Sequence, residues 1–326
     1  MPALRVIKAG MLTTVQDLGR WGFQARGVPV GGPMDPVSHR VANALVGNPA
    51  DCATLEVTLL GPEIEFEDAR TVAVAGGQFD VSVDGESVPT NTAVPVRAGG
   101  RLKVGGRRRG ARAYIAIAGG IDTPLVLGSR ATHLLSAMGG LDGRALRAGD
   151  RLPLGTAAGP QMSPHRAARL SGLFDRVPDS GRPAIVRVLP GPQADRFTDE
   201  ALDVLQSAPY VVGEQSNRMG FRLEGPRLPH RTGADIISDA TPLGVLQVPA
   251  SGQPILLMAD RQTAGGYPKL ATVITADIGI AGQLGAGDSL RFVVCSRREA
   301  LAALIAQERA LMAVETASAR SGGTSR

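Results

Sequence analysis

The sequence predicts a mainly β protein with a few helices, arranged as two related halves in one chain. Most apolar segments are short and alternate with polar residues, which is the period-two pattern of half-buried strands. The chain contains 42 glycines and 23 prolines, a content that favours many turns over long helices. One phrase, a glycine turn leading into a strand, recurs at residues 96–102, 146–152 and 284–290. Short strands at this spacing indicate antiparallel sheets or barrels.

The first half begins with a short strand at residues 4–7, followed by a polar, glycine-rich stretch and one clear helix. Asp35 is a good N-cap and Pro36 suits the first helical position, so we expect the helix to begin there. His39 falls on the polar face of this helix, where we expect it to be exposed.

Strands dominate the rest of the first half. Period-two alternation begins at Leu55 and continues through a series of strands to residue 118. Asp84-Gly85 is typical of a two-residue hairpin turn. The arginine cluster at residues 107–109 is flanked by glycines and has no interleaved aromatic residues. We expect it to be a solvated hairpin tip rather than a nucleic-acid-binding surface.

The second half opens with a strand at residues 184–189 and continues with further short strands. A helix fits residues 198–206, and a capping box at residues 296–299 predicts the start of a long C-terminal helix. The last residues are mostly serine, glycine, arginine and threonine, which is typical of a disordered tail. The predicted organisation is a first subdomain at 1–160, a linker region at 161–183, a second subdomain with the C-terminal helix at 184–315, and a disordered tail at 316–326.

Composition argues against several classes of protein. The net charge is +5, but only three of the 35 basic residues are lysine, a skew that codon bias in a GC-rich genome explains. No apolar run approaches the roughly 18 residues of a membrane span, and the N-terminus lacks the apolar segment of a signal peptide. Cys52 and Cys295 lie far apart without a metal-binding or disulfide pattern. We therefore expect a cytoplasmic protein that binds neither nucleic acid nor membrane.

Several catalytic and cofactor motifs are missing from the sequence. It has no phosphate-binding P-loop, no dinucleotide fingerprint and no G-x-S-x-G. The four histidines show no metal-ligand spacing, so we predict no metal site. None of the lysines lies between methionines, as a biotinylated lysine usually does, so we predict no biotin attachment site and no covalently bound cofactor.

The stretch at residues 260–269 is the most informative for function. Adjacent glycines let a backbone approach a ligand closely or adopt positive φ, and lysine is so rare here that Lys269 indicates a role that arginine cannot fill. We interpret the stretch as part of a polar small-molecule site, with a sharp structural turn as the alternative. Its candidate site residues are Asp260, Gln262, Gly265, Gly266, Tyr267 and Lys269.

Two further polar stretches are candidates for the same site. In the first, Gln16, Asp17 and Arg20 could grip a ligand that carries a carboxylate, or could form a surface ion pair that closes a loop. In the second, Asn217 and Arg218 lie near glycines and suit recognition of a planar amide or carboxylate. The alternative for the second stretch is a turn with asparagine in the left-handed region.

Several of these motifs also occur, in the same order, in one known family. They are residues 14–20 (TVQDLGR), 27–29 (GVP), 34–35 (MD), 42–43 (AN), 55–56 (LE), 216–220 (SNRMG), 247–249 (QVP) and 265–268 (GGYP). Across residues 3–295 the chain resembles the allophanate hydrolase subunit 2 family, also described as the A and B half of a biotin-dependent carboxyltransferase domain. Pro33 and Ala264 are small departures, at positions where members often have alanine and threonine.

The resemblance implies a pair of cyclophilin-like β-barrel subdomains and a smaller partner of the subunit 1 type that completes a composite site. It also implies three possible functions. Members include the C subunit of a bacterial ATP-dependent 5-oxoprolinase, the carboxyltransferase component of a biotin-dependent urea carboxylase, and a non-catalytic regulator that antagonises a histidine-kinase inhibitor.

We expect the first of these functions, because the chain has neither a carrier lysine nor an ATP loop of its own. It would act with proteins like the A and B subunits of 5-oxoprolinase, be inactive alone, and help to open a small amide or lactam with ATP bound at a partner. Lys269, Arg218 and Asp260 are the expected catalytic residues, with the cations stabilising negative charge on an acyl or phosphoryl oxygen. The expected substrate-binding residues are Gln16, Asp17, Arg20, Asn217, Gln262, Gly265, Gly266 and Tyr267.

Overall fold

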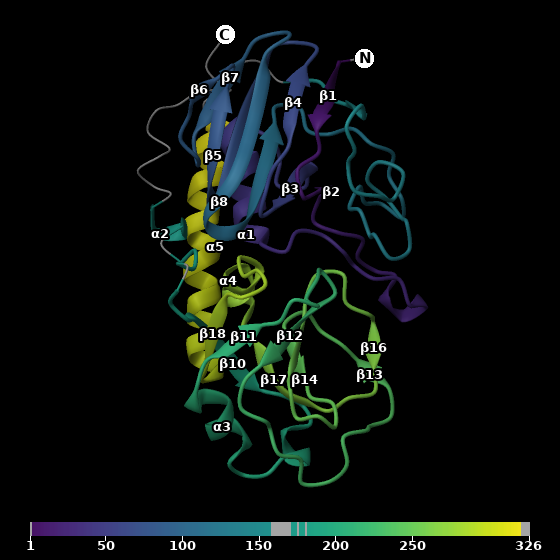
Figure 1. The fold of residues 1–326 in the computed structure, drawn as a ribbon, viewed down its shortest axis with the longest axis vertical. Helices are drawn as coiled ribbons and strands as arrows, with labels where there is room; N and C mark the ends of the chain where they lie inside the picture. Colours follow the sequence, from purple (N-terminus) through teal and green to yellow (C-terminus); the bar gives the residue numbers. More distant parts are fainter. Residues whose placement is uncertain (1, 158–170, 175, 180, 321–326) are drawn as a thin grey trace. The chain divides into compact units, whose positions relative to one another are not determined.

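The computed structural model describes residues 2–157, 171–174, 176–179 and 181–320, which form two compact units (Figure 1). Neither unit is one continuous stretch of chain. The first comprises Met1–Arg20, Gly31–Val177 and Glu308–Arg326, and the second comprises Trp21–Val30 and Pro178–Gln307.

This division differs from the predicted boundaries. Residues 21–30 belong to the second unit, although they were expected in the first subdomain, and residues 308–315 belong to the first unit instead of the second. Leu311 and Val314 account for the second difference, because both are buried in an apolar cluster of the first unit. Of the predicted linker at 161–183, residues 161–170, 175 and 180 lie outside the described part of the chain.

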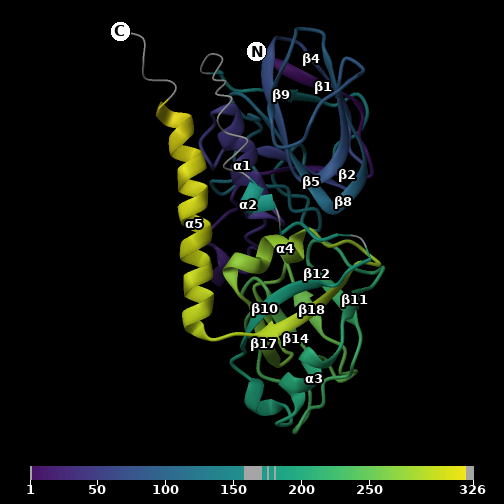
Figure 2. The ribbon, with the colours of Figure 1, turned by 90° about the vertical axis from the view of Figure 1, so that its left-hand side faces the viewer.

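The first unit is built on a nine-stranded antiparallel sheet that curls around an apolar core (Figure 2). The main path runs β2-β3-β8-β4-β1-β9, and the long strand β5 pairs with β8, β6 and β7. Leu4, Val6, Leu55, Phe66 and Ile115 are fully buried in the core, as period-two alternation predicts. The strands are β1 (Ala3–Lys8), β2 (Leu12–Gln16), β3 (Thr54–Thr58), β4 (Glu63–Phe66), β5 (Arg70–Val83), β6 (Glu86–Ser87), β7 (Ala93–Val96), β8 (Arg101–Ile117) and β9 (Arg151–Pro153).

Helix α1 (Pro36–Val46) packs on the outer face of β5 and β8. It begins where the sequence predicts, because the Asp35 carboxylate accepts a hydrogen bond from the Ser38 amide at 3.1 Å and proline occupies the first turn. His39, however, is fully buried, so the prediction that it is exposed is wrong. Its ring lies between the Thr54 hydroxyl at 2.9 Å and the Ala50 carbonyl oxygen at 3.0 Å.

The arginine cluster at residues 107–109 is not a hairpin tip. It lies inside β8, where it pairs with β5 across register shifts near Phe79. The flanking glycines, which are typical of a turn, instead lie within this strand, where its pairing with β5 contains bulges. The actual hairpin at Asp84-Gly85 is confirmed: both residues have positive φ, at 50° and 90°, between β5 and β6.

The second unit contains a closed barrel in the order β10-β17-β14-β15-β12-β11-β18, and parallel pairing of β18 with β10 closes it. Its core includes the fully buried Val186, Tyr210, Phe221, Leu256 and Phe292. The barrel strands are β10 (Ala184–Pro190), β11 (Tyr210–Val212), β12 (Gly220–Glu224), β14 (Val245–Gln247), β15 (Ile255–Leu257), β17 (Lys269–Val273) and β18 (Ser289–Val294). The prediction of a mainly β protein with two barrel-like subdomains is confirmed, with the sheet of the first unit curled as a half-barrel.

A small antiparallel ribbon of β13 (Asp239–Ala240) and β16 (Ala264–Gly265) lies beside the barrel of the second unit. The predicted helix at 198–206 is present as the shorter α3 (Ala201–Ser207). The other short helices among the described residues are η1 (Gln24–Arg26), α2 (Ser171–Phe174), η3 (Ala194–Arg196), η4 (Thr275–Asp277) and α4 (Ile278–Gly282).

Helix α5 (Arg297–Arg320) starts at the predicted capping box. The Ser296 hydroxyl accepts from the Glu299 amide at 3.2 Å, and the Glu299 carboxylate accepts from the Ser296 amide at 2.7 Å. The helix continues through residues 316–320, so the predicted disordered tail does not begin at 316, and residues 321–326 lie outside the described chain. No helix among the described residues is long and apolar enough to span a membrane.

Candidate functional site

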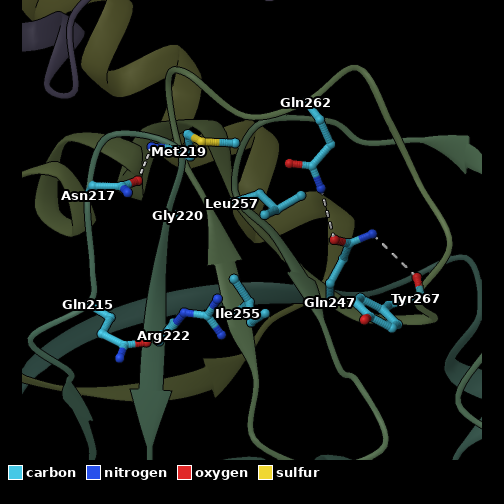
Figure 3. A pocket seen from close by; sticks show the side chains of 10 residues that line it. All are labelled: Gln215, Asn217, Met219, Gly220, Arg222, Gln247, Ile255, Leu257, Gln262 and Tyr267. Carbon is cyan, nitrogen blue, oxygen red and sulfur yellow. Dashed lines mark hydrogen bonds between the residues drawn. The ribbon is translucent and has the colours of Figure 1, made fainter. Parts of the chain in front are cut away.

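A cavity of about 210 Å³ lies on the second unit, against the outer face of β12 and β15 (Figure 3). Strand alternation explains its position. Phe221 and Leu256 are buried in the barrel, so their neighbours Gly220, Arg222 and Ile255 lie on the opposite face. The cavity is lined by Gln215, Asn217, Met219, Gly220, Arg222, Gln247, Ile255, Leu257, Gln262 and Tyr267.

The loop before β12 forms one wall of this cavity. The Asn217 side-chain oxygen accepts a hydrogen bond from the Met219 amide at 2.8 Å, and the Ser216 hydroxyl accepts from the Arg222 amide at 3.0 Å. These bonds hold the loop in a compact turn, so Asn217 shapes the wall that it also lines.

Arg218 and Asp260, two of the predicted catalytic residues, pair with each other beside the cavity. The guanidinium donates to both carboxylate oxygens, at 2.9 Å and 3.0 Å, and both side chains are buried. The Asp260 amide also donates to the Arg218 carbonyl oxygen at 2.9 Å. Neither side chain lines the described cavity. The pair instead fastens the loop before β12 to the segment that follows β15.

Lys269, the third predicted catalytic residue, also lies outside the cavity lining. It is completely buried, and its ammonium donates to the Asp239 carboxylate at 2.9 Å and to the Gln193 side-chain oxygen at 3.4 Å. The hydrogen bond from Lys269 holds the pKa of Asp239 below its usual value. Lys269 therefore joins β17 of the barrel to the β13–β16 ribbon.

Neither glycine of the 260–269 stretch has positive φ, and of the two only Gly265 makes a close approach: a Cβ atom on Gly266 would meet nothing nearer than the Ile236 carbonyl oxygen at 3.5 Å. A Cβ atom on Gly265 would lie 2.5 Å from the Gln247 side-chain nitrogen, so only glycine leaves room for that amide. Gln247 accepts from the Gln262 amide nitrogen at 3.3 Å and donates to the Tyr267 carbonyl oxygen at 3.5 Å (Figure 3). These contacts form the second wall of the cavity.

Gln16, Asp17 and Arg20 belong to the first unit, where they hold the loop at residues 129–132. The Gln16 amide donates to the Thr132 carbonyl oxygen at 3.1 Å, and Asp17 accepts from the Ser129 hydroxyl at 2.5 Å. Arg20 is buried and donates to the Ala131 carbonyl oxygen. The expectation that these three residues share one site with the residues of the second unit stays a prediction.

Among the predicted substrate-binding residues, Asn217, Gln262 and Tyr267 do line the cavity. Sequence reasoning did not select Gln215, Arg222 or Gln247 as site residues. Arg222 could have been found from alternation: it lies two residues after Gly220 and flanks the apolar Phe221, so it must face outward on the same side as Gly220.

Arg222 is the charged side chain among the residues that line the cavity. Burial lowers the pKa of Arg261, next to Gln262, to about 10, and its guanidinium donates to the Thr241 carbonyl oxygen at 2.8 Å. Within the described ranges, no cluster of three or more histidine, cysteine, aspartate or glutamate side chains could hold a metal ion. The arrangement therefore favours binding of a small polar ligand through amides and a guanidinium.

Comparison with known proteins places most of the chain in one family. Residues 26–294 match the family model described as carboxyltransferase domain, subdomain A and B. The chain is 41% identical to the C subunit of 5-oxoprolinase from Escherichia coli strain K12 over 306 residues, which cover 94% of this chain and 96% of that protein. It is 34% identical to the C subunit of 5-oxoprolinase from Haemophilus influenzae, over 88% of this chain and 89% of that protein.

A solved structure shows the same fold within a larger protein. The chain superimposes on the Kluyveromyces lactis urea carboxylase with a TM-score of 0.88 and 32% identity. The match covers 97% of this chain and 29% of that chain, so this chain corresponds to less than a third of that enzyme.

Proposed function

Because this chain belongs to the family of carboxyltransferase domains with subdomains A and B, we propose that it is the C-type subunit of an ATP-dependent 5-oxoprolinase. With partner subunits it would help to convert 5-oxoproline to glutamate. The observation that carries the proposal is the 41% identity to the C subunit of a 5-oxoprolinase along nearly the whole of both chains.

The proposed reaction divides naturally between subunits. The lactam carbonyl is a poor electrophile, so we propose that ATP, bound at an A-like or B-like partner, phosphorylates its oxygen and leaves as ADP. Water then adds to the carbon, the ring C–N bond breaks to free the amine, and a second water hydrolyses the resulting acyl phosphate to glutamate and phosphate. The sequence of this chain has no phosphate-binding loop, which supports a nucleotide site elsewhere in the complex. This chain would bind and orient the lactam through side-chain amides such as Gln247 and Gln262.

A carboxyltransferase role in a biotin-dependent urea carboxylase is the second candidate. The TM-score of 0.88 to a urea carboxylase supports it. In that case a carrier protein would supply carboxybiotin, since none of Lys8, Lys103 and Lys269 lies between methionines.

Reconstitution separates the two candidates. The chain is co-purified with its A-like and B-like partners, and ATP hydrolysis is measured with 5-oxoproline and, separately, with urea, bicarbonate and a biotinylated carrier. We expect glutamate and phosphate to form only with 5-oxoproline and only when this chain is present. Undiminished 5-oxoproline turnover by the partners alone would remove the proposal, and urea-dependent turnover would favour the second candidate.

A further inference from the structure

The cavity of the second unit has two chemically different ends (Figure 3). Arg222 and Gln215 lie at one end, and the linked amides of Gln247 and Gln262 lie at the other. The side chain of Ile255 lies between them, so the middle of the cavity is apolar. A ligand that fits this pattern has an anionic group, a short aliphatic segment and a polar amide.

The Arg222 guanidinium is the cationic group at the first end. Arg222 is exposed, and its guanidinium makes no hydrogen bond or ion pair with any residue in the described part of the chain. Arg218, four residues earlier, is instead buried and paired with Asp260. Strand β12, which carries Arg222, is hydrogen-bonded within the closed barrel, so the guanidinium projects from a rigid base. Its planar fork matches the two oxygens of a carboxylate.

The amide pair at the second end can bind a lactam through hydrogen bonds. Gln262 donates one N–H to the Gln247 oxygen at 3.3 Å, which fixes the orientation of the Gln262 amide. Its own side-chain oxygen accepts no hydrogen bond from the described residues, so it can accept one from the N–H of a cyclic amide. The second N–H of the Gln262 amide can donate to the carbonyl of that ligand.

We propose that this cavity binds a cyclic amide that carries a carboxylate, with the carboxylate on Arg222 and the lactam group on Gln262. Arg222 is then the carboxylate-binding residue of the chain, a role that belongs to neither of the buried cations, Arg218 and Lys269. The proposal rests on the proposed function, because 5-oxoproline is the cyclic amino-acid lactam that this function supplies.

The test replaces Arg222 in the assembled enzyme and follows the kinetics with 5-oxoproline. A charge-assisted hydrogen-bonded contact is worth about 1.5–3 kcal/mol, so Arg222→Gln should raise KM about 10- to 150-fold while kcat changes little. Arg222→Lys keeps the positive charge but lacks the planar guanidinium, so its KM should lie between those of the wild type and Arg222→Gln. Arg227→Gln, which alters an exposed arginine outside the cavity, is the matched control and should match the wild type.

The melting temperature of each variant is measured alongside, because a fold defect would lower it while loss of carboxylate recognition would not. An unchanged KM in Arg222→Gln, or an equal rise in Arg227→Gln, overturns the inference and leaves the proposed function standing. If the wild-type complex does not turn over 5-oxoproline, the proposed function fails. Calorimetric titration of 5-oxoproline into the complex then decides the inference: binding at least tenfold weaker in Arg222→Gln supports it, and equal or absent binding overturns it.

Discussion

Replacing Asp260 by asparagine tests the conclusion that the Arg218–Asp260 pair holds the cavity wall together. The substitution preserves the shape of the side chain and removes its charge, leaving a buried guanidinium without its counter-ion. Both side chains are only 5% exposed, and two hydrogen bonds of 2.9 Å and 3.0 Å are affected. Breaking a buried pair by removing one partner costs about 3–5 kcal/mol.

The loss should therefore lower the melting temperature of the second unit by about 10 °C, at roughly 3 °C per kcal/mol. Urea unfolding followed by circular dichroism gives the stability, and amide hydrogen exchange shows which unit opens. A paired replacement, Arg218→Met with Asp260→Leu, removes both charges and should recover most of the stability.

A cost below about 1 kcal/mol for Asp260→Asn, which is the range of an exposed pair, would refute this role for the pair. A double variant as unstable as the single one would refute it equally. Amide hydrogen exchange that becomes faster only in the first unit would contradict the conclusion that the pair stabilises the second unit.

Three other contacts give measurable outcomes. Burial lowers the pKa of His39 from 6.5 to about 4, so the imidazole takes up its proton at higher pH in the unfolded chain than in the folded one. The free energy of unfolding should therefore fall by up to about 3 kcal/mol as the pH drops from about 6.5 to 4. Urea titrations should show a steeper pH dependence of stability in the wild type than in His39→Gln, and equal pH slopes would contradict this prediction. Gly265→Ala should displace the Gln247 amide, raising the KM of the assembled enzyme severalfold and lowering the free energy of unfolding by about 1 kcal/mol. An unchanged KM would contradict this prediction. Lys269→Met should release the Asp239 end of the β13–β16 ribbon. Amide hydrogen exchange in the ribbon should then become severalfold faster while the barrel stays protected. An unchanged exchange rate in the ribbon would argue against the conclusion that Lys269 joins the ribbon to the barrel.

Local rules of chain geometry made parts of the fold predictable. The start of α1 at Asp35, the hairpin at Asp84-Gly85 and the capping box at Ser296 each depend on residues within four positions of one another. The merging of strands into β8 was not predictable in this way. Its glycines are typical of turns, and only long-range pairing with β3, β4 and β5 keeps residues 101–117 in one strand.

The candidate site shows the same limit. Asn217 and Tyr267 lie in polar, glycine-rich stretches, so sequence alone selected them. Arg218 and Lys269 were selected for their charge, yet each is buried against a carboxylate 42 or 30 residues away. Such pairings arise only when the barrel closes. The same holds for Gln247, whose place in the cavity depends on its contact with Gln262 from another loop.

Titration of this chain into its partner proteins tests the central claim most directly. With A-like and B-like partners, ATP and 5-oxoproline held constant, the rate of glutamate formation is measured as the chain is added. We predict a rate near zero without the chain, a linear rise, and saturation at a fixed molar ratio. A rate that does not depend on the chain would contradict the claim that it is a working subunit of a 5-oxoprolinase.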